Sequence, residues 1–260
     1  MSYALTDSAT MLRRNLKRML RYPGMTIMLV AMPIVFLLLF VYVFGGTLGA
    51  GIGGASGGRA QYVNYVTPAI ILMTITAAVQ GTTISVAMDM TEGIVDRFRT
   101  MAIARVSVLA GHVVGSLIQT MLGIAMVTGV ALLIGFRPTA GPAHWLALVG
   151  VLLMMAFAFI WLSVALGLAS KTVESSSNVG MPLILLPFLG SGFVPTDSMP
   201  TVLRWFAEYQ PFTPLIETIR GLLMGTPIGN SAAIAVGWCA VITLGGYLWS
   251  KKLFNRESTR

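Results

Sequence analysis

Two polar segments hold the side chains of this 260-residue chain that are most able to do chemistry, and both lie between long apolar stretches. The first contains Glu92, Gly93, Ile94, Asp96, Arg97, Phe98 and Arg99. Ile94, Phe98 and Met101 recur at helical spacing, so a short helix here would present an apolar ridge flanked by charges. Such a ridge suits docking: it either enters the groove of a partner or packs against the bundle of the same chain.

The second segment mixes aromatic residues, prolines and one pair of opposite charges. It contains Trp205, Tyr209, Pro211, Thr213, Pro214, Glu217 and Arg220. Helix-start signals at 198–200 and 213–214 predict two amphipathic helices, which run towards Tyr209 and Gly225. Each is too short to cross a bilayer, so we expect re-entrant or interfacial helices.

Enzyme chemistry lacks its usual parts in this sequence. There is no GxxxxGK[ST], HExxH or GxSxG pattern, and His112 and His144 are expected at opposite ends of a long apolar segment. The single cysteine, Cys239, excludes an internal disulfide and a cysteine-clustered metal site. Glu217 and Arg220 fit a structural i, i+3 ion pair better than a substrate ligand. The sequence therefore predicts no catalytic residue, no metal and no cofactor bound by this chain.

A glycine-rich stretch, 45–58, satisfies a GxGxxG pattern through Gly49, Gly51 and Gly54. A dinucleotide site needs a strand before this turn and an acidic residue about twenty positions later, whereas no Asp or Glu follows before Asp89. We therefore expect a flexible loop outside the membrane and not a nucleotide site.

The composition is that of a membrane protein, with 56% apolar residues, only 10% charged ones and a mean hydropathy of +0.82. Six apolar segments predict an all-α membrane protein with six transmembrane helices. They are Gly24–Phe44, Val66–Met88, Val106–Gly135, Trp145–Ala169, Asn178–Val194 and Ala232–Ser250. None contains Asp, Glu, Lys or Arg, so proton or ion coupling through a buried carboxylate is disfavoured. The fifth segment holds Pro182 and Pro187 and is expected to be kinked or broken.

The distribution of Lys and Arg orients these segments, because cytoplasmic loops are enriched in both. One side takes Arg13, Arg14, Lys17, Arg18, Arg21, Arg97, Arg99, Arg105, Lys171, Lys251, Lys252, Arg256 and Arg260. The other side takes only Arg59, Arg137, Arg204 and Arg220. Both termini are therefore predicted to be cytoplasmic, and the net charge of +8 reflects topology and not nucleic-acid binding.

Three regions follow from this topology. Residues 1–23 form an amphipathic entry helix whose basic face is suited to lipid head groups of the inner leaflet. Residues 24–255 form the six-helix membrane domain, and 256–260 a cytoplasmic tail. The entry helix either only anchors the chain or also transmits force.

Candidate pathway residues are flexible, aromatic or hydrogen-bonding side chains within the predicted spans. They are Met28, Met32, Phe36, Gln80, Thr83, Met181 and Phe188. Thioethers and aromatic rings suit varied lipophilic substrates, although they suit lipid contact and core packing equally. A small-residue stripe at Gly111, Gly115 and Gly123 indicates close helix packing along the third span.

Together, these features resemble the ABC type-2 permeases, in particular the daunorubicin-resistance branch. The resemblance rests on the basic entry helix, the six spans, the segment Glu92–Arg99 (EGIVDRFR) and the segment Gln210–Glu217 (QPFTPLIE), on opposite membrane faces. It covers essentially the whole chain. Ala102 departs from the family pattern, in which many relatives have proline. Without that proline, the short helix that contains Ile94 and Phe98 could extend further along the chain.

The resemblance implies a half-transporter in the cell membrane, powered by a separate ATPase subunit that binds ATP and Mg²⁺. Two permease copies and two ATPases would form the complex. The segment Glu92–Arg99 would dock on the ATPase, the first, second and fifth spans would face a pathway between the copies, and the re-entrant helices would close it on the outside. The expected cargo is a lipophilic drug, an antibiotic or a lipid.

Two other functions fit the same sequence. A self-sufficient channel or secondary carrier is suggested by Gln80 and the hydroxyl-rich second span. An exporter of polysaccharide or sodium would share the architecture and every motif. Flux through the chain alone in liposomes separates the first from an ATP-driven permease, and substrate assays separate the second.

Overall fold

The computed structural model describes residues 13, 17, 21, 23–53, 58–91, 105–170 and 172–256. Every regular element within these ranges is helical, which confirms the predicted all-α class. The entry helix falls largely on residues 1–22 and lies outside the described residues, apart from three isolated positions.

Five helical stretches are long and apolar enough to cross a membrane, namely Leu29–Ile52, Arg59–Thr91, Gly111–Leu133, Pro142–Ala169 and Ser231–Leu253. The α-helices are α2 (Pro23–Leu39), α3 (Gly45–Gly53), α4 (Arg59–Thr91), α6 (Arg105–Leu133), α7 (Pro142–Ala169), α8 (Val173–Leu185), α9 (Thr201–Tyr209), α10 (Phe212–Met224) and α11 (Ser231–Arg256). The π-helix η1 (Phe40–Phe44) joins α2 to α3, and 3₁₀ turns occupy η3 (Leu186–Leu189) and η4 (Thr196–Ser198).

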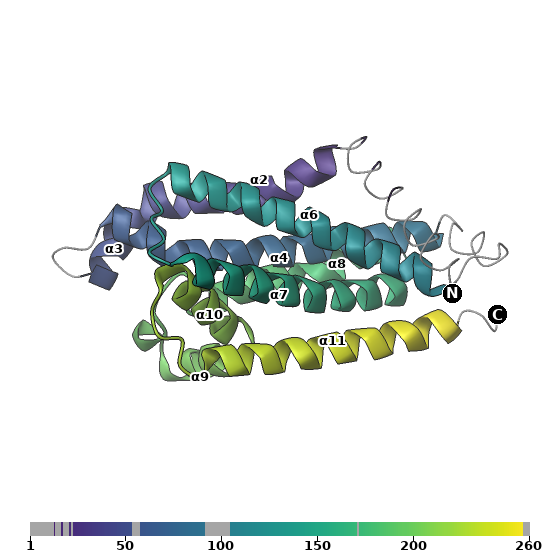
Figure 1. The fold of residues 1–260 in the computed structure, drawn as a ribbon. Helices are drawn as coiled ribbons and strands as arrows, with labels where there is room; N and C mark the ends of the chain where they lie inside the picture. Colours follow the sequence, from purple (N-terminus) through teal and green to yellow (C-terminus); the bar gives the residue numbers. More distant parts are fainter. Residues whose placement is uncertain are drawn as a thin grey trace.

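The long helices lie side by side, and their directions alternate along the bundle (Figure 1). The short helices α9 and α10 gather at one end, beside α3 and the start of α11. We call this the α9–α10 end. The end of α4, the start of α6 and the end of α11 lie at the opposite end, which we call the α4–α6 end.

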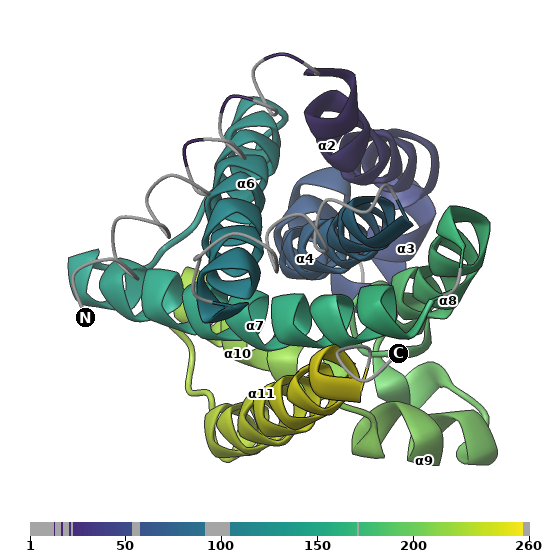
Figure 2. The same ribbon diagram turned by 90° about the vertical axis from the view of Figure 1, so that its right-hand side faces the viewer.

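Helix α4 is the centre of the fold. It contacts α2, α3, α6, α7, α8 and α10, and Figure 2 shows it between α2, α6, α7 and α8. Apolar residues occur on every side of this helix, and side chains such as Val66, Ile70 and Leu72 are fully buried, as expected for a helix without a solvent-facing or lipid-facing stripe. Pro68 is accommodated within this helix.

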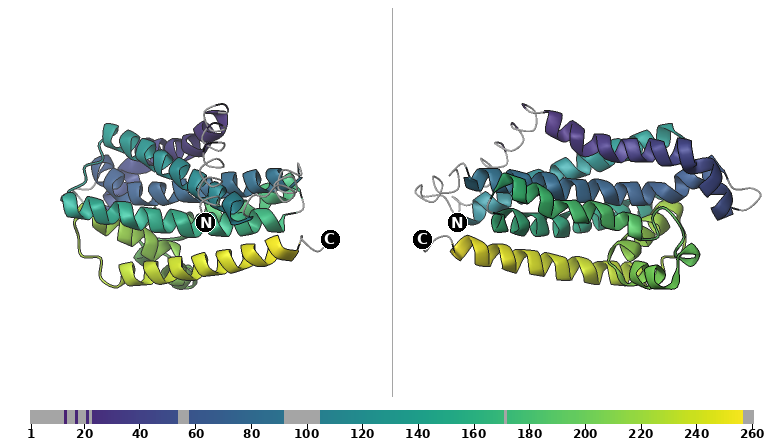
Figure 3. Two further views of the ribbon diagram at one scale, coloured as in Figure 1. Left: turned by 45° about the vertical axis from the view of Figure 1, so that its right-hand side comes forward. Right: turned by 180° about the vertical axis from the view of Figure 1, so that it is seen from behind.

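Helix α11 packs lengthwise on α7 (Figure 3). Gly246 permits the close approach, because a Cβ atom there would lie 2.8 Å from the backbone nitrogen of Leu162 and 2.8 Å from the carbonyl carbon of Trp161. Trp161 also meets Tyr247 edge to face, with 5.1 Å between ring centroids. Small and aromatic residues therefore set the distance between these helices.

The helix ends are closed by specific caps. Arg137 Nη1 donates to the carbonyls of Leu132 (2.9 Å) and Phe136 (3.0 Å) after the end of α6, where a cation also complements the helix dipole. Gly225, with φ of 64°, ends α10 in the left-handed conformation that glycine adopts without strain. Thr172 accepts a hydrogen bond from the Ser175 N–H (3.1 Å) at the start of α8.

The structure corrects two details of the predicted topology. Residues 45–53 of the expected flexible loop form α3, because the helix of the first span continues through η1 without interruption. The fifth predicted span starts earlier, at Val173, and breaks after Leu185, where η3 begins at Leu186 next to Pro187. The predicted break is therefore present, and neither piece is long enough to count among the five candidate spans.

The α7–α11 contact generates the first prediction. Replacing Gly246 with Ala should push α11 away from the α7 backbone and destabilise the protein by about 1–3 kcal/mol. Thermal unfolding of the purified protein in detergent measures this loss. Gly245→Ala is the matched control, because a Cβ there meets nothing within 4 Å. Equal melting temperatures for the two variants would contradict the packing role of Gly246.

Candidate functional site

The predicted docking segment lies outside the described residues. This covers Glu92, Gly93, Ile94, Asp96, Arg97, Phe98 and Arg99. The helices on either side of the segment are described, since α4 ends at Thr91 and α6 begins at Arg105. The end of α4 and the start of α6 both lie at the α4–α6 end of the bundle (Figure 1).

A buried acid–imidazole pair lies close to these two ends. Helix α4 continues past the predicted limit at Met88 and includes Asp89, whose Oδ2 lies 3.0 Å from His112 Nε2 on α6. Asp89 is 2% exposed and His112 5% exposed. Helix α4 thus carries a carboxylate one residue beyond the apolar segment Val66–Met88, whose limit was set by hydropathy alone. The sequence did contain a clue. Asp89 directly follows the second predicted span, and His112 is the one titratable residue of the third predicted span.

Phenylalanine rings join α2 and η1 to the chain around η3. Phe188 and Phe193 stack with 4.5 Å between centroids and 9° between planes, and Phe40 lies 4.6 Å from Phe193. Phe36 meets Phe188 edge to face at 5.4 Å. Two predicted pathway residues, Phe36 and Phe188, are therefore in contact, inside a cluster that connects the first and fifth predicted spans.

The other predicted pathway residues separate into two groups. Met32 on α2 is 58% exposed and Met181 on α8 is 60% exposed, while the Gln80 Nε2 donates to the Ser177 carbonyl (3.3 Å) between α4 and α8. Thr83 is fully buried and bonds to the carbonyls of Val79 and Ser163, so it faces α7 and does not join the others. The side chain of Met28 lies outside the described parts.

A polar cluster at the α9–α10 end links three parts of the chain. We call Tyr65, Ser191, Thr213, Glu217 and Arg220 the Arg220 cluster. Arg220 donates to Glu217, as predicted for i, i+3, and to the carbonyls of Ser191 (2.9 Å) and Tyr65 (3.2 Å). The Tyr65 hydroxyl and the Ser191 hydroxyl complete it, donating to the Ser191 carbonyl (2.7 Å) and to Glu217 Oε1 (2.6 Å).

The Arg220 guanidinium also lies over the ring of Tyr65, 4.0 Å from its centroid. Because Tyr65 is on α4, Ser191 follows η3 and Arg220 is on α10, one cation fixes all three relative to each other. Sequence reasoning found the charged pair but missed Tyr65 and Ser191, since no spacing rule relates residues so far apart in the chain.

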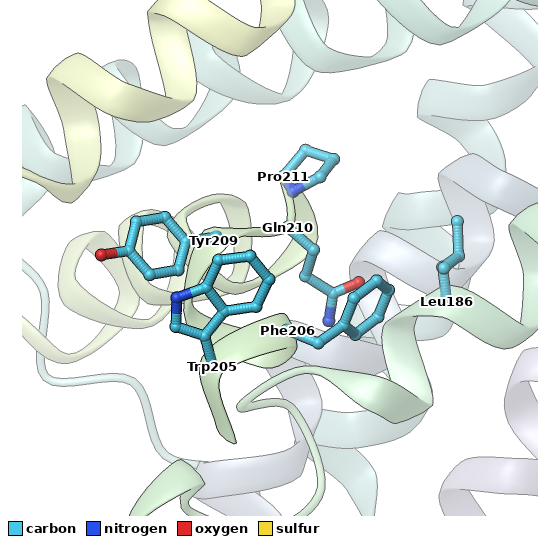
Figure 4. A pocket seen from close by; sticks show the side chains of 6 residues that line it. All are labelled: Leu186, Trp205, Phe206, Tyr209, Gln210 and Pro211. Carbon is cyan, nitrogen blue, oxygen red and sulfur yellow. The ribbon is translucent and has the colours of Figure 1, made fainter. Parts of the chain in front are cut away.

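A cavity of about 320 Å³ opens beside α9 (Figure 4). Its lining is Leu186, Trp205, Phe206, Tyr209, Gln210 and Pro211. Trp205 and Tyr209 are exposed and lie 5.1 Å apart between centroids, whereas Gln210 is 6% exposed and neither of its amide atoms has a hydrogen-bond partner. Of the remaining predicted residues, Pro214 is buried in α10, and Thr213 accepts from the Ser191 N–H (3.2 Å).

The charged side chains of α9 point elsewhere. Arg204 pairs with Asp197 (2.8 Å) and with Glu208 (2.8 Å) on an exposed face, and the hydrogen bond that it donates to Glu208 raises the pKa of Arg204. Helix α9 therefore has a charged face and an aromatic one, and its amphipathic pattern is the one expected from sequence.

Within the described residues, neither the α4–α6 end nor the α9–α10 end has the composition of a metal centre or of a catalytic site. Within the described ranges, no group of three or more His, Cys, Asp or Glu side chains could hold a metal ion. The arrangement instead offers an exposed lipophilic face on α2 and α8, a polar cluster at one end and a buried acid–imidazole pair at the other.

Comparison with known proteins identifies relatives that match most of this chain. Residues 7–224 match the ABC-2 type transporter family. The chain is 28% identical over 247 residues to a daunorubicin resistance ABC transporter permease protein, DrrB1, of Streptomyces coeruleorubidus, which covers 92% of this chain and 83% of the relative.

Two further relatives are more distant or matched over less of the chain. A probable doxorubicin resistance ABC transporter permease protein, DrrC, of Mycobacterium tuberculosis is 28% identical over 66% of this chain and 63% of its own length. Nodulation protein J of Rhizobium leguminosarum bv. viciae is 23% identical over 85% of each. The match to the family and the helical membrane architecture agree, and the chain belongs to the ABC-2 type transporter family as a permease subunit of an ABC exporter.

Proposed function

We propose that this chain is the membrane half of an exporter that moves a lipophilic drug, antibiotic or lipid out of the cell with energy from a separate ATPase subunit. The observation that supports the cargo most directly is the similarity to a daunorubicin resistance permease over 92% of the chain. The exposed apolar face of α2 and α8 is consistent with such a cargo, because Met and Phe side chains adapt to varied lipophilic shapes.

The proposed topology has six membrane segments and both termini in the cytoplasm. The five long helices supply five of them, and α8 with η3 supplies the sixth as a broken helix. The α9–α10 end then faces the outside, with α9 and α10 as interfacial or re-entrant helices, and the entry helix of residues 1–23 lies on the inner leaflet.

The α4–α6 end then faces the cytoplasm, where the segment Glu92–Arg99 docks on the ATPase. That partner binds ATP and Mg²⁺, and this chain binds neither. Docking places the ATPase at the ends of two helices, α4 and α6, of which α4 is the central helix of the bundle. Movement of the ATPase therefore acts on the element with the most neighbours.

The pathway in this proposal lies between two copies of the chain, along the faces of α2 and α8 that flank α4. Met32, Phe36, Gln80, Met181 and Phe188 belong to it, and Met28 is retained from the sequence. Thr83 does not belong to it, because it is buried against α7. The large exposed apolar surface of α2 supports coverage by a second copy or by lipid.

Transport then proceeds by exchange between two states. ATP binding brings the two ATPases together, shifts the docked segments and moves α4 and α6 with them, so that the affinity for drug falls as the pathway opens outward. The Arg220 cluster holds α10 against α4 and keeps the outer end closed while the drug binds from the inside.

Reconstitution tests the function as a whole. The chain should co-purify with an ATPase subunit, and liposomes with both should transport daunorubicin only when ATP is present. Asp96→Ala should weaken ATPase capture, whereas Arg137→Ala, at the proposed outer end, should not. Daunorubicin flux through liposomes that contain this chain alone, without ATP, would overturn the proposal in favour of a channel or secondary carrier.

Cysteine protection tests the pathway. In a Cys239→Ala background, Met32→Cys and Met181→Cys should react with a hydrophobic maleimide, and daunorubicin should slow both reactions about threefold or more at saturating concentration. Leu244→Cys, exposed on α11, is the control and should be unaffected, because α11 does not contact α2. Protection of Leu244 alone would place the pathway elsewhere.

Substitution of Arg220 tests the outer closure. Arg220→Gln removes a charge that holds two backbone carbonyls and a carboxylate, which should cost about 1.5–3 kcal/mol of stability. Arg204→Gln removes two exposed ion pairs, which solvent screens, and is the control. Thermal unfolding measures both, and dye leakage through the chain in liposomes should rise only for Arg220→Gln. The proposed closure is wrong if Arg204→Gln is equally leaky.

A further inference from the structure

The buried Asp89–His112 pair has no role in the mechanism so far. Its two atoms are 3.0 Å apart, and it joins α4 to α6, the two helices between which the docking segment lies. Asp89 is two residues before the end of α4 at Thr91, and His112 is seven residues after the start of α6 at Arg105.

Apolar residues lie next to both members of the pair along their helices. A small separate cluster at this end contains Val86, one turn before Asp89, and Val113, next to His112. A buried charged or polar group that loses a partner is costly. The pair therefore holds strongly once formed, even though burying it has little net benefit.

Apolar side chains would hold the two helices together equally well, but they would permit sliding. A hydrogen bond between two short side chains does not, because an axial shift of one residue moves a helix by about 1.5 Å. The pair thus fixes the register of α4 against α6, as buried polar pairs do in coiled coils.

We infer that Asp89 and His112 are positioning residues for coupling: they lock α4 to α6 so that both ends of the docking segment move as one unit with the two helices. The inference rests on the proposed function, in which the ATPase acts on that segment. Without the lock, ATPase movement would slide α6 along α4 instead of moving the bundle, and ATP would be hydrolysed without export.

A second hydrogen bond between the same helices provides a matched control. Thr82 donates to the Ser116 hydroxyl at 2.9 Å and lies nearly two helical turns before Asp89 on α4. It is neutral and more distant from the docking segment. Loss of either bond removes one link between α4 and α6, so a purely structural role predicts similar effects for both.

The test compares daunorubicin exported per ATP hydrolysed by the reconstituted complex with its ATPase. Asp89→Ala and His112→Ala, which remove the hydrogen bond, should each lower this ratio about fivefold or more while ATP hydrolysis continues. Thr82→Val should leave the ratio within about twofold of the wild type. Equal ratios for Asp89→Ala, His112→Ala and Thr82→Val would overturn the inference.

A cross-link decides the matter if the single variants assemble poorly. In a Cys239→Ala background, Asp89→Cys/His112→Cys should be uncoupled, and a short bis-methanethiosulfonate reagent that joins the two thiols should restore the ratio until a reductant releases it. A cross-linked complex that stays uncoupled contradicts the lock. Failure of the proposed function has a different signature, because the wild-type complex itself would then export no daunorubicin.

Discussion

Hydrocarbon offers no partner for a polar group, and this constraint determines most of the structure. Backbone groups satisfy it by forming helices throughout the described ranges. Hydroxyl side chains satisfy it by bonding to their own helix: Thr67 donates to the Val63 carbonyl and Thr74 to the Ile70 carbonyl. Such side chains contribute no specificity between helices, however polar the sequence looks.

The few polar contacts that cross between helices are therefore informative. In the membrane region of the described structure they include Gln80 with Ser177, Thr82 with Ser116, and the Asp89–His112 pair. Each connects α4 to a neighbour. Apolar packing gathers the helices, and these contacts determine how they are aligned, which matters in a protein that must move while its helices stay paired.

The sequence was sufficient for the helical class, the long helices and the family, because hydropathy and charge are read directly from single residues. It also predicted the Glu217–Arg220 pair, which needs only i, i+3 spacing. It did not give α3, because glycine-rich stretches predict loops unless a helix already runs into them. It also could not predict which residues surround Tyr65 and Thr83. A buried helix that packs against neighbours on all sides has no periodic pattern that would show which side faces which neighbour.

The π-helix η1 has a consequence for how this chain tolerates change in length. A π turn contains one residue more than an α turn, and Arg59 covers it by stacking on Tyr42 at 5.0 Å. Deleting one residue between Phe40 and Phe44 would convert the π turn to an α turn and leave the side chains from Pro23 to Leu39 facing the same neighbours, because the π turn accommodates one extra residue. The chain should therefore tolerate the loss of one residue in this turn, whereas a deletion within an α-helical part of the first span would turn the preceding side chains by about 100° about the helix axis.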